Sequence, residues 1–206
     1  MRRLAMMAVL LSMVSAGAAS ANAFGQFIPA SPLRGGDNMF GGYLLLGDRV
    51  GDDVGLLGQV RFSSSPKFDW GLQFGFAGGD ETAVLIGGDI RPILHAADPD
   101  FPLDLAFDAG LGLSIADHYT LIEIVPAIEG SHRFDLEGSS SSLTPYMSVG
   151  LDINHFSVED GGDDTDTDVV ARFGLEWEAT RKLGVMAEFG VGDLANDFIL
   201  GVNVPF

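Results

Sequence analysis

Apolar and polar residues alternate in short segments along most of this chain. In Phe68–Phe76 every even-numbered position is apolar, and the odd-numbered positions are Asp, Gly, Gln and Gly. The segment Leu103–Ile115 alternates in the same way. Because successive side chains of a strand point to opposite faces, each segment predicts a strand with one apolar face and one polar or small face.

Ten such segments can be identified, with residues typical of turns between them: 40–47, 56–62, 68–76, 82–91, 103–115, 120–134, 143–156, 169–178, 183–191 and 198–206. Many have a length near that which a tilted strand needs to cross a bilayer. No segment has a convincing helical period. We therefore predict an all-β, antiparallel up-and-down barrel of about ten strands, or of eight if 40–47 and 82–91 are not strands.

The direction of the apolar faces separates a membrane barrel from a soluble, lipocalin-like barrel. The chain is 47% hydrophobic and 19% charged, with a mean hydropathy of +0.25. The faces opposite the apolar ones are rich in glycine, which suits the crowded interior of a narrow barrel. Both observations favour a transmembrane barrel with its apolar face toward lipid.

The amino-terminal residues have the pattern of a secretory signal. Met1-Arg2-Arg3 precedes an apolar run and an Ala-Asn-Ala site, so we predict a signal peptide at 1–23. Residues 24–38 then form an extended lead-in, and 39–206 form the barrel. Cleavage would leave a strongly acidic chain with a net charge of −20, from 9 basic and 29 acidic residues. Such a chain is a poor nucleic-acid ligand, and without cysteine it can form no disulfide.

The last segment, Phe198–Phe206, is an amphipathic strand that ends in an aromatic residue. It resembles the final strand of bacterial outer-membrane β-barrels, and the whole chain is similar in character to the OmpA-like and OmpX-like group. The resemblance implies a place in the outer membrane, contact with its lipid, and recognition of Phe206 by the barrel assembly machinery. We expect Pro205 to limit pairing at the very end of this strand, so that the barrel closes against 40–47 mainly through the residues before it.

Aromatic residues gather at the segment ends that the topology places together on the periplasmic side. We expect them to form a girdle at one lipid boundary. Its predicted members are Phe62, Phe68, Trp70, Phe134, Trp177 and Phe206.

Charged residues on the polar faces are predicted to line the lumen. The predicted network contains Arg61, Arg91, Arg172, Asp69, Asp89, Asp104, Asp108, Glu123, Glu176 and Glu188. Since buried charges are costly unless paired or hydrated, we expect the arginines to lie in a carboxylate network. Such a network would act as a structural plug, although an excess of carboxylates would also suit a narrow passage that prefers cations.

Two polar stretches could carry chemistry. The acidic run Asp160–Asp168 is expected to form an extracellular loop, and its oxygen atoms could bind a divalent cation. His155 and Ser157 are similar to the His-x-Ser of outer-membrane lipid A deacylases, but Val158 stands where that family has Asn. We therefore predict no catalytic residues, no resident metal and no cofactor.

The sequence thus predicts a non-enzymatic outer-membrane barrel with a structural or surface-interaction role in the cell envelope. The alternatives are a narrow cation-preferring channel, an outer-membrane lipid-modifying enzyme and a soluble ligand-binding barrel.

Overall fold

The computed structural model describes residues 27–33, 37–47, 53–78, 82–158, 162–192 and 196–206. The predicted signal peptide lies outside these residues. None of the described residues belongs to a helix that is long and apolar enough to cross a membrane.

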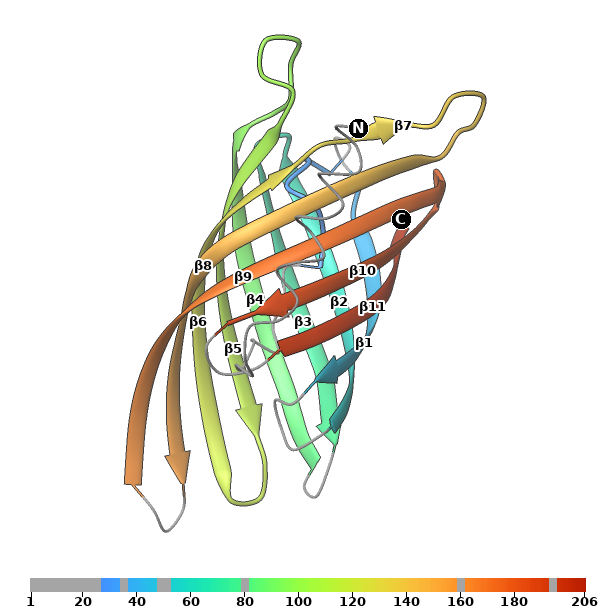
Figure 1. Ribbon diagram of the computed structural model, residues 1–206. Coiled ribbons are helices and arrows are strands. Elements are labelled where there is room, and N and C mark those ends of the chain that lie inside the picture. The colour runs from blue at the N-terminus through green and yellow to red at the C-terminus, as the bar shows by residue number, and fades with distance from the viewer. Residues whose placement is uncertain (1–26, 34–36, 48–52, 79–81, 159–161, 193–195) are drawn as a thin grey trace, which may run out of the picture.

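Antiparallel strands make up about four fifths of the described chain (Figure 1). The long strands are β1 (Met39–Gly47), β2 (Asp53–Ser65), β3 (Phe68–Gly78), β4 (Thr82–His95), β5 (Asp104–Ile115), β6 (Tyr119–Ser131), β8 (Ser142–Val158), β9 (Gly162–Thr180), β10 (Leu183–Val191) and β11 (Asn196–Pro205). The two-residue strand β7 (Phe134–Asp135) pairs with the start of β8. Each long strand pairs with the next, and β1 pairs with β11, which closes the barrel. The predicted ten-stranded up-and-down barrel is confirmed.

The seam between β1 and β11 runs the full length of β1. Its register extends from Met39 opposite Pro205 to Gly47 opposite Asp197. Asn38 and Phe206 then exchange two backbone hydrogen bonds of 3.2 and 2.9 Å. The barrel closes mainly through the residues before Pro205, as expected. Pairing nevertheless continues past Pro205, because proline removes only one donor and Phe206 supplies its own donor and acceptor beyond it.

Strands β8 and β9 are longer than the sequence pattern indicated. β9 begins at Gly162, and its first residues pair with β8 from Val158 opposite Gly162 to Asp152 opposite Asp168. Most of the predicted loop at 159–168 is therefore strand. Aspartate is unfavourable in strands, but here a continuous ladder with β8 fixes the backbone. Figure 1 shows this pair extending away from the end of the barrel where the last strand, β11, finishes.

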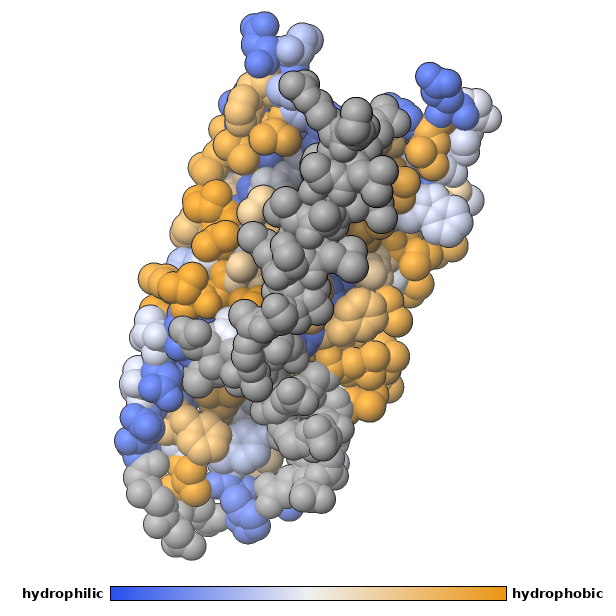
Figure 2. Space-filling model, in the orientation of Figure 1, coloured by the Kyte–Doolittle hydropathy of each residue, from blue (hydrophilic) through white to orange (hydrophobic). Residues whose placement is uncertain are grey.

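The barrel is apolar on the outside and polar on the inside. Leu56 and Leu111 on the outer wall are 63% and 57% exposed, whereas Arg61 and Glu129 on the inner face are 0% exposed. Figure 2 shows hydrophobic side chains over the outer wall and hydrophilic ones toward both ends. A soluble barrel requires the reverse arrangement, so the structure has the surface of a transmembrane barrel.

Glycines on the inner face make room for two tyrosine rings. A Cβ at Gly201 would lie 2.2 Å from Cδ1 of Tyr43, and one at Gly174 would lie 1.9 Å from Cζ of Tyr146. Each glycine faces its tyrosine across the ladder. The tyrosines therefore lie against the wall of the lumen instead of standing away from it.

Candidate functional site

The aromatic residues predicted as a girdle lie at strand ends on the side of the barrel that holds Met39 and Phe206. Phe206 stacks on Phe40 with ring centroids 4.2 Å apart, and Phe62 stacks on Trp70 at 4.6 Å. The indole of Trp70 donates a 3.1 Å hydrogen bond to Ser64 near the end of β2. An apolar ring with a polar contact at its outer edge suits the boundary between hydrocarbon and headgroups.

Phe68 also lies at this end and is half-buried, and Phe134 and Trp177 are 51% and 46% exposed. All six predicted girdle residues are thus near the same end of the barrel, as the strand bounds require.

Arg61 forms the centre of one group of buried charges. It projects from β2 and donates to the carboxylates of Asp69 on β3 and Asp89 on β4. All three side chains are at least nine-tenths buried. Charge-assisted hydrogen bonds of this kind offset part of the cost of burying the ions.

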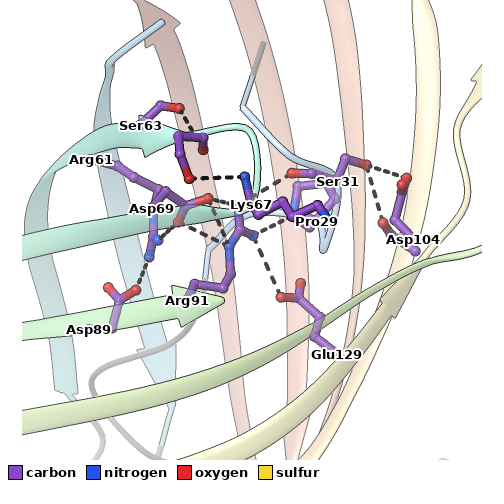
Figure 3. Close-up of polar contacts among 12 residues, drawn as sticks. Pro29, Ser31, Arg61, Ser63, Lys67, Asp69, Asp89, Arg91, Asp104 and Glu129 are labelled. Carbon is purple, nitrogen blue, oxygen red and sulfur yellow. Dashed lines mark hydrogen bonds and ion pairs between the residues drawn. The ribbon is translucent and has the colours of Figure 1, made fainter. Parts of the chain in front are cut away.

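Arg91 on β4 links this group to Glu129 on β6 and to the amino-terminal segment (Figure 3). Its guanidinium lies 2.8 Å from Asp69 and 3.7 Å from Glu129. It also donates to the backbone carbonyls of Pro29 and Ser31, the latter at 3.3 Å. Arg91 therefore binds the wall of the barrel and the amino-terminal segment at once.

The segment 27–33 lies inside the barrel toward the end that holds Met39 and Phe206. The ring of Phe27 stacks on Tyr43 with centroids 4.4 Å apart, and Asn203 donates to the Phe27 carbonyl at 3.4 Å. The Ser31 hydroxyl donates to Asp104 at 3.0 Å and lies 3.2 Å from the hydroxyl of Ser131. These contacts make the segment an internal plug.

The sequence pattern predicted the same segment only as an extended lead-in. Phe27, Ile28 and Ala30 are almost completely buried, and their apolar character is the one signal that pointed inward. A segment without a period gives no face to assign, so its partners could not be identified from the sequence.

Arg172 forms the centre of a second group of buried charges, on β9. It lies 3.1 Å from Glu188 and 3.4 Å from Asp197. Glu188 also accepts a 2.8 Å hydrogen bond from the hydroxyl of Tyr146. The three arginines predicted for the lumen thus belong to two groups on different walls.

The remaining predicted lumen residues fall into two sets. Asp104, Asp108 and Glu123 are buried on the inner face. Glu176 lies near the mouth at the end that holds Phe206, where Asn203 donates to it at 3.0 Å. Glu178, two residues further along β9, was not among the predicted residues and lies 2.6 Å from Arg133. These mouth residues line a cavity of about 280 Å³ between the amino-terminal segment and strands β9 to β11.

Acidic groups outnumber basic ones in the lumen. Among the described residues, three arginines and nine carboxylates are buried. The buried carboxylates are those of Asp69, Asp89, Asp104, Asp108, Glu123, Glu129, Asp152, Glu188 and Asp197. The lumen therefore has a negative potential that attracts cations and repels anions.

The other candidate residues lie at the far end of the barrel. Asp163, Asp164 and Asp166 are exposed on the first part of β9, and Asp160 is outside the described residues. Within the described part of the chain, no three His, Cys, Asp or Glu side chains group closely enough to hold a metal ion. His155 forms its hydrogen bond with Thr165, at 2.9 Å.

No protein-family model and no curated protein matches the chain. Among solved structures, it is similar to the N-terminal β-barrel domain of Pseudomonas aeruginosa OprF, with a TM-score of 0.42, 12% identity, and coverage of 84% of this chain and 98% of that one. The KdgM porin has a TM-score of 0.41 and 13% identity, with coverage of 82% of this chain and 99% of that one. Ail of Yersinia pestis has a TM-score of 0.33 and 14% identity, with coverage of 84% of this chain and 100% of that one.

The location of the protein in the cell follows from its own outer surface and lumen. A closed barrel of ten long strands with an apolar wall and a charged lumen is the architecture of bacterial outer-membrane proteins. The chain is a small β-barrel of the outer membrane.

Proposed function

We propose that this protein is a closed, non-enzymatic barrel with a structural or surface-interaction role in the cell envelope. The observation that carries the proposal is the segment 27–33 inside the barrel. It is held by the side chains of Arg91, Asn203 and Asp104, which belong to three different strands. A lumen filled by its own chain and by ion pairs stabilises the wall without offering an open path.

The first part of β9 supports the surface-interaction aspect of the role. Residues Gly162–Val170 extend past Val191, the last residue of β10, which pairs with Ala171. Asp163, Asp164 and Asp166 are exposed there. This acidic extension is available to a cationic group at the cell surface.

A narrow cation-preferring passage is the second candidate function. The excess of buried carboxylates over arginines favours it. It requires the plug to leave the lumen, because the plug contacts the ion pairs of Arg91 directly.

Planar-bilayer conductance distinguishes the two functions. We expect no conductance steps from the full-length protein, and cation-selective steps from a variant that lacks residues 27–33. A Glu137→Gln variant, changed in an exposed turn, is the matched control and should be silent. Cation-selective steps from the unaltered protein would overturn the proposal in favour of a channel.

The envelope role has its own test in cells. Deletion of the protein from its native host should increase sensitivity to bile salts and to large antibiotics that the outer membrane excludes. The full-length protein should restore resistance. An unchanged sensitivity in the deletion strain contradicts a structural role.

A further inference from the structure

A small internal cavity lies between the inner faces of β3, β4, β5, β6, β8 and β9. Its volume is about 10 Å³, enough for one species the size of a water molecule. The polar residues around it are Gln73, Asp89, Asp108, Ser148 and Arg172. Neither the plug nor the girdle contributes to this lining.

Two carboxylates at the cavity have oxygen atoms without a partner. Asp89 and Asp108 are 8% and 2% exposed. Within the described part of the chain, Asp89 Oδ1 and Asp108 Oδ2 have no hydrogen-bond donor, although Arg61 donates to the other oxygen of Asp89. A buried anionic oxygen that accepts no hydrogen bond is energetically costly, so each requires a hydrogen-bond donor or a cation.

The nearby arginines do not supply enough positive charge. Arg61 is shared between Asp69 and Asp89. Arg91 is shared between Asp69 and Glu129. Within the described part of the chain, Asp108 forms no ion pair with Arg61 or Arg91 within 4 Å. Arg172, which also lines the cavity, is bound by Glu188 and Asp197. Two arginines therefore face four carboxylates in this part of the lumen.

We propose that the cavity between Asp89 and Asp108 binds a small monovalent cation of the sodium type. Carboxylate oxygens of the two aspartates, the amide oxygen of Gln73 and the hydroxyl of Ser148 supply hard oxygen ligands. A space for one water-sized species excludes hydrated Mg²⁺, which retains several of its waters. The site goes beyond the proposed function, because the bound cation would balance the negative charge of Asp89 and Asp108 whether the barrel is closed or conducts ions.

Gly110 leaves room for the cation and offers a specific way to remove it. This residue lies on β5 directly opposite Asp89 and lines the cavity. A Cβ built at Gly110 meets no heavy atom closer than the Val125 carbonyl oxygen at 3.9 Å. Gly110→Ala should therefore fold, keep both carboxylates and occupy part of the space.

The test compares the thermal unfolding of the full-length protein in detergent between salts. Heat-modifiable gel mobility reports the folded fraction. Unfolding midpoints are measured in NaCl, KCl and N-methylglucamine chloride at equal ionic strength. A site that binds Na⁺ in the folded state raises the midpoint in NaCl. We expect KCl to have a smaller effect, because the larger K⁺ favours longer bonds to more oxygen ligands than the four side chains around this cavity supply.

Four variants locate the effect. We expect Gly110→Ala and Asp108→Asn to lose the sodium-dependent rise. Gly42→Ala, whose added Cβ meets nothing within 4 Å, and Asp100→Asn in an exposed turn should retain it. An equal rise in all five proteins would overturn the site.

A proton shared by the two aspartates is the competing explanation for the missing charge. In that case the midpoint of the unaltered protein would be the same in all three salts and would rise as the pH is lowered. Either of these two results contradicts sodium binding. Neither depends on whether the barrel conducts, so this test and the conductance test can fail separately.

Discussion

The outer wall and the lumen are built from alternate residues of the same strands, yet they depend on their neighbours in opposite ways. Leu72 and Ile86 on the wall are 55% and 46% exposed and require only a hydrocarbon surrounding. Arg61, on the inner face, is completely buried and requires both Asp69 and Asp89. The wall is therefore specified by the class of each residue, and the lumen by the identity of each partner.

The largest effect should come from removing the central partner in the lumen. Arg61→Met leaves Asp69 with only Arg91 and leaves Asp89 without an ion pair. We expect this change to lower the free energy of unfolding by about 3–5 kcal/mol, as for a broken buried ion pair. Urea unfolding in lipid vesicles measures it.

Arg133→Met is the matched control. Arg133 pairs with Asp135 and Glu178, but its side chain is 31% exposed. Its loss should cost about 1 kcal/mol or less. Equal losses for the two variants would remove the contrast between buried and exposed ion pairs.

A charge on the wall should cost slightly less than a broken pair in the lumen. Leu72 lies near the middle of β3 and faces outward. We expect Leu72→Lys to destabilise the barrel by about 2–4 kcal/mol in lipid vesicles, because the ammonium meets hydrocarbon. Leu72→Met should have little effect. A stable Leu72→Lys protein would show that this face is not in contact with lipid.

Two glycines, one on β11 and one on β1, test the contrast between lumen and outer wall by the size of the side chain that each face tolerates. Gly201 faces Tyr43 across the seam, and a methyl group there would collide with the tyrosine ring. We expect Gly201→Ala to cost about 1–3 kcal/mol through overpacking. Gly42→Ala, on the outer face, should be close to neutral. Similar results for both variants would contradict the crowding inferred for the lumen.

The smallest effect concerns Asp98, which belongs to neither region. Its carboxylate accepts hydrogen bonds from the backbone amides of Phe101 and Asp100, at 2.8 and 2.9 Å. These bonds lower the pKa of Asp98 below its usual value. Their stabilising effect is present above the usual aspartate pKa of about 3.9 and is lost as the pH falls through the lowered value.

Nuclear magnetic resonance titration of the Phe101 amide measures this transition. We expect its chemical shift to change at a pH below the usual aspartate pKa, and Asp98→Ala should abolish the change. A midpoint at or above the usual value would mean that the turn does not hold the carboxylate.

The sequence predicted the wall better than it predicted the contents of the lumen. Alternation in Phe68–Phe76 is a local property, so it identified a strand and the direction of both its faces. The start of β9 was not predicted, because Asp163, Asp164 and Asp166 resemble a solvated loop until β8 is placed beside them.

The partners within the lumen depend on the register of distant strands. The sequence placed Arg61 and Asp89 on inner faces, but it did not pair them, because their strands are neither consecutive nor adjacent. The plug could not be predicted, since Ser31 has no periodic context and its partner Ser131 lies 100 positions away. The absence of cysteine from the chain, however, makes this contact easy to test.

The position of the plug is the central claim, and a double cysteine variant tests it most directly. Because the hydroxyls of Ser31 and Ser131 lie 3.2 Å apart, Ser31→Cys with Ser131→Cys should form a disulfide under mild oxidation. Ser31→Cys with Ser148→Cys is the control and should not. A cross-linked peptide in the mass spectrum of the first variant is the expected result. Two free thiols in the oxidised, folded first variant would show that the segment lies outside the lumen.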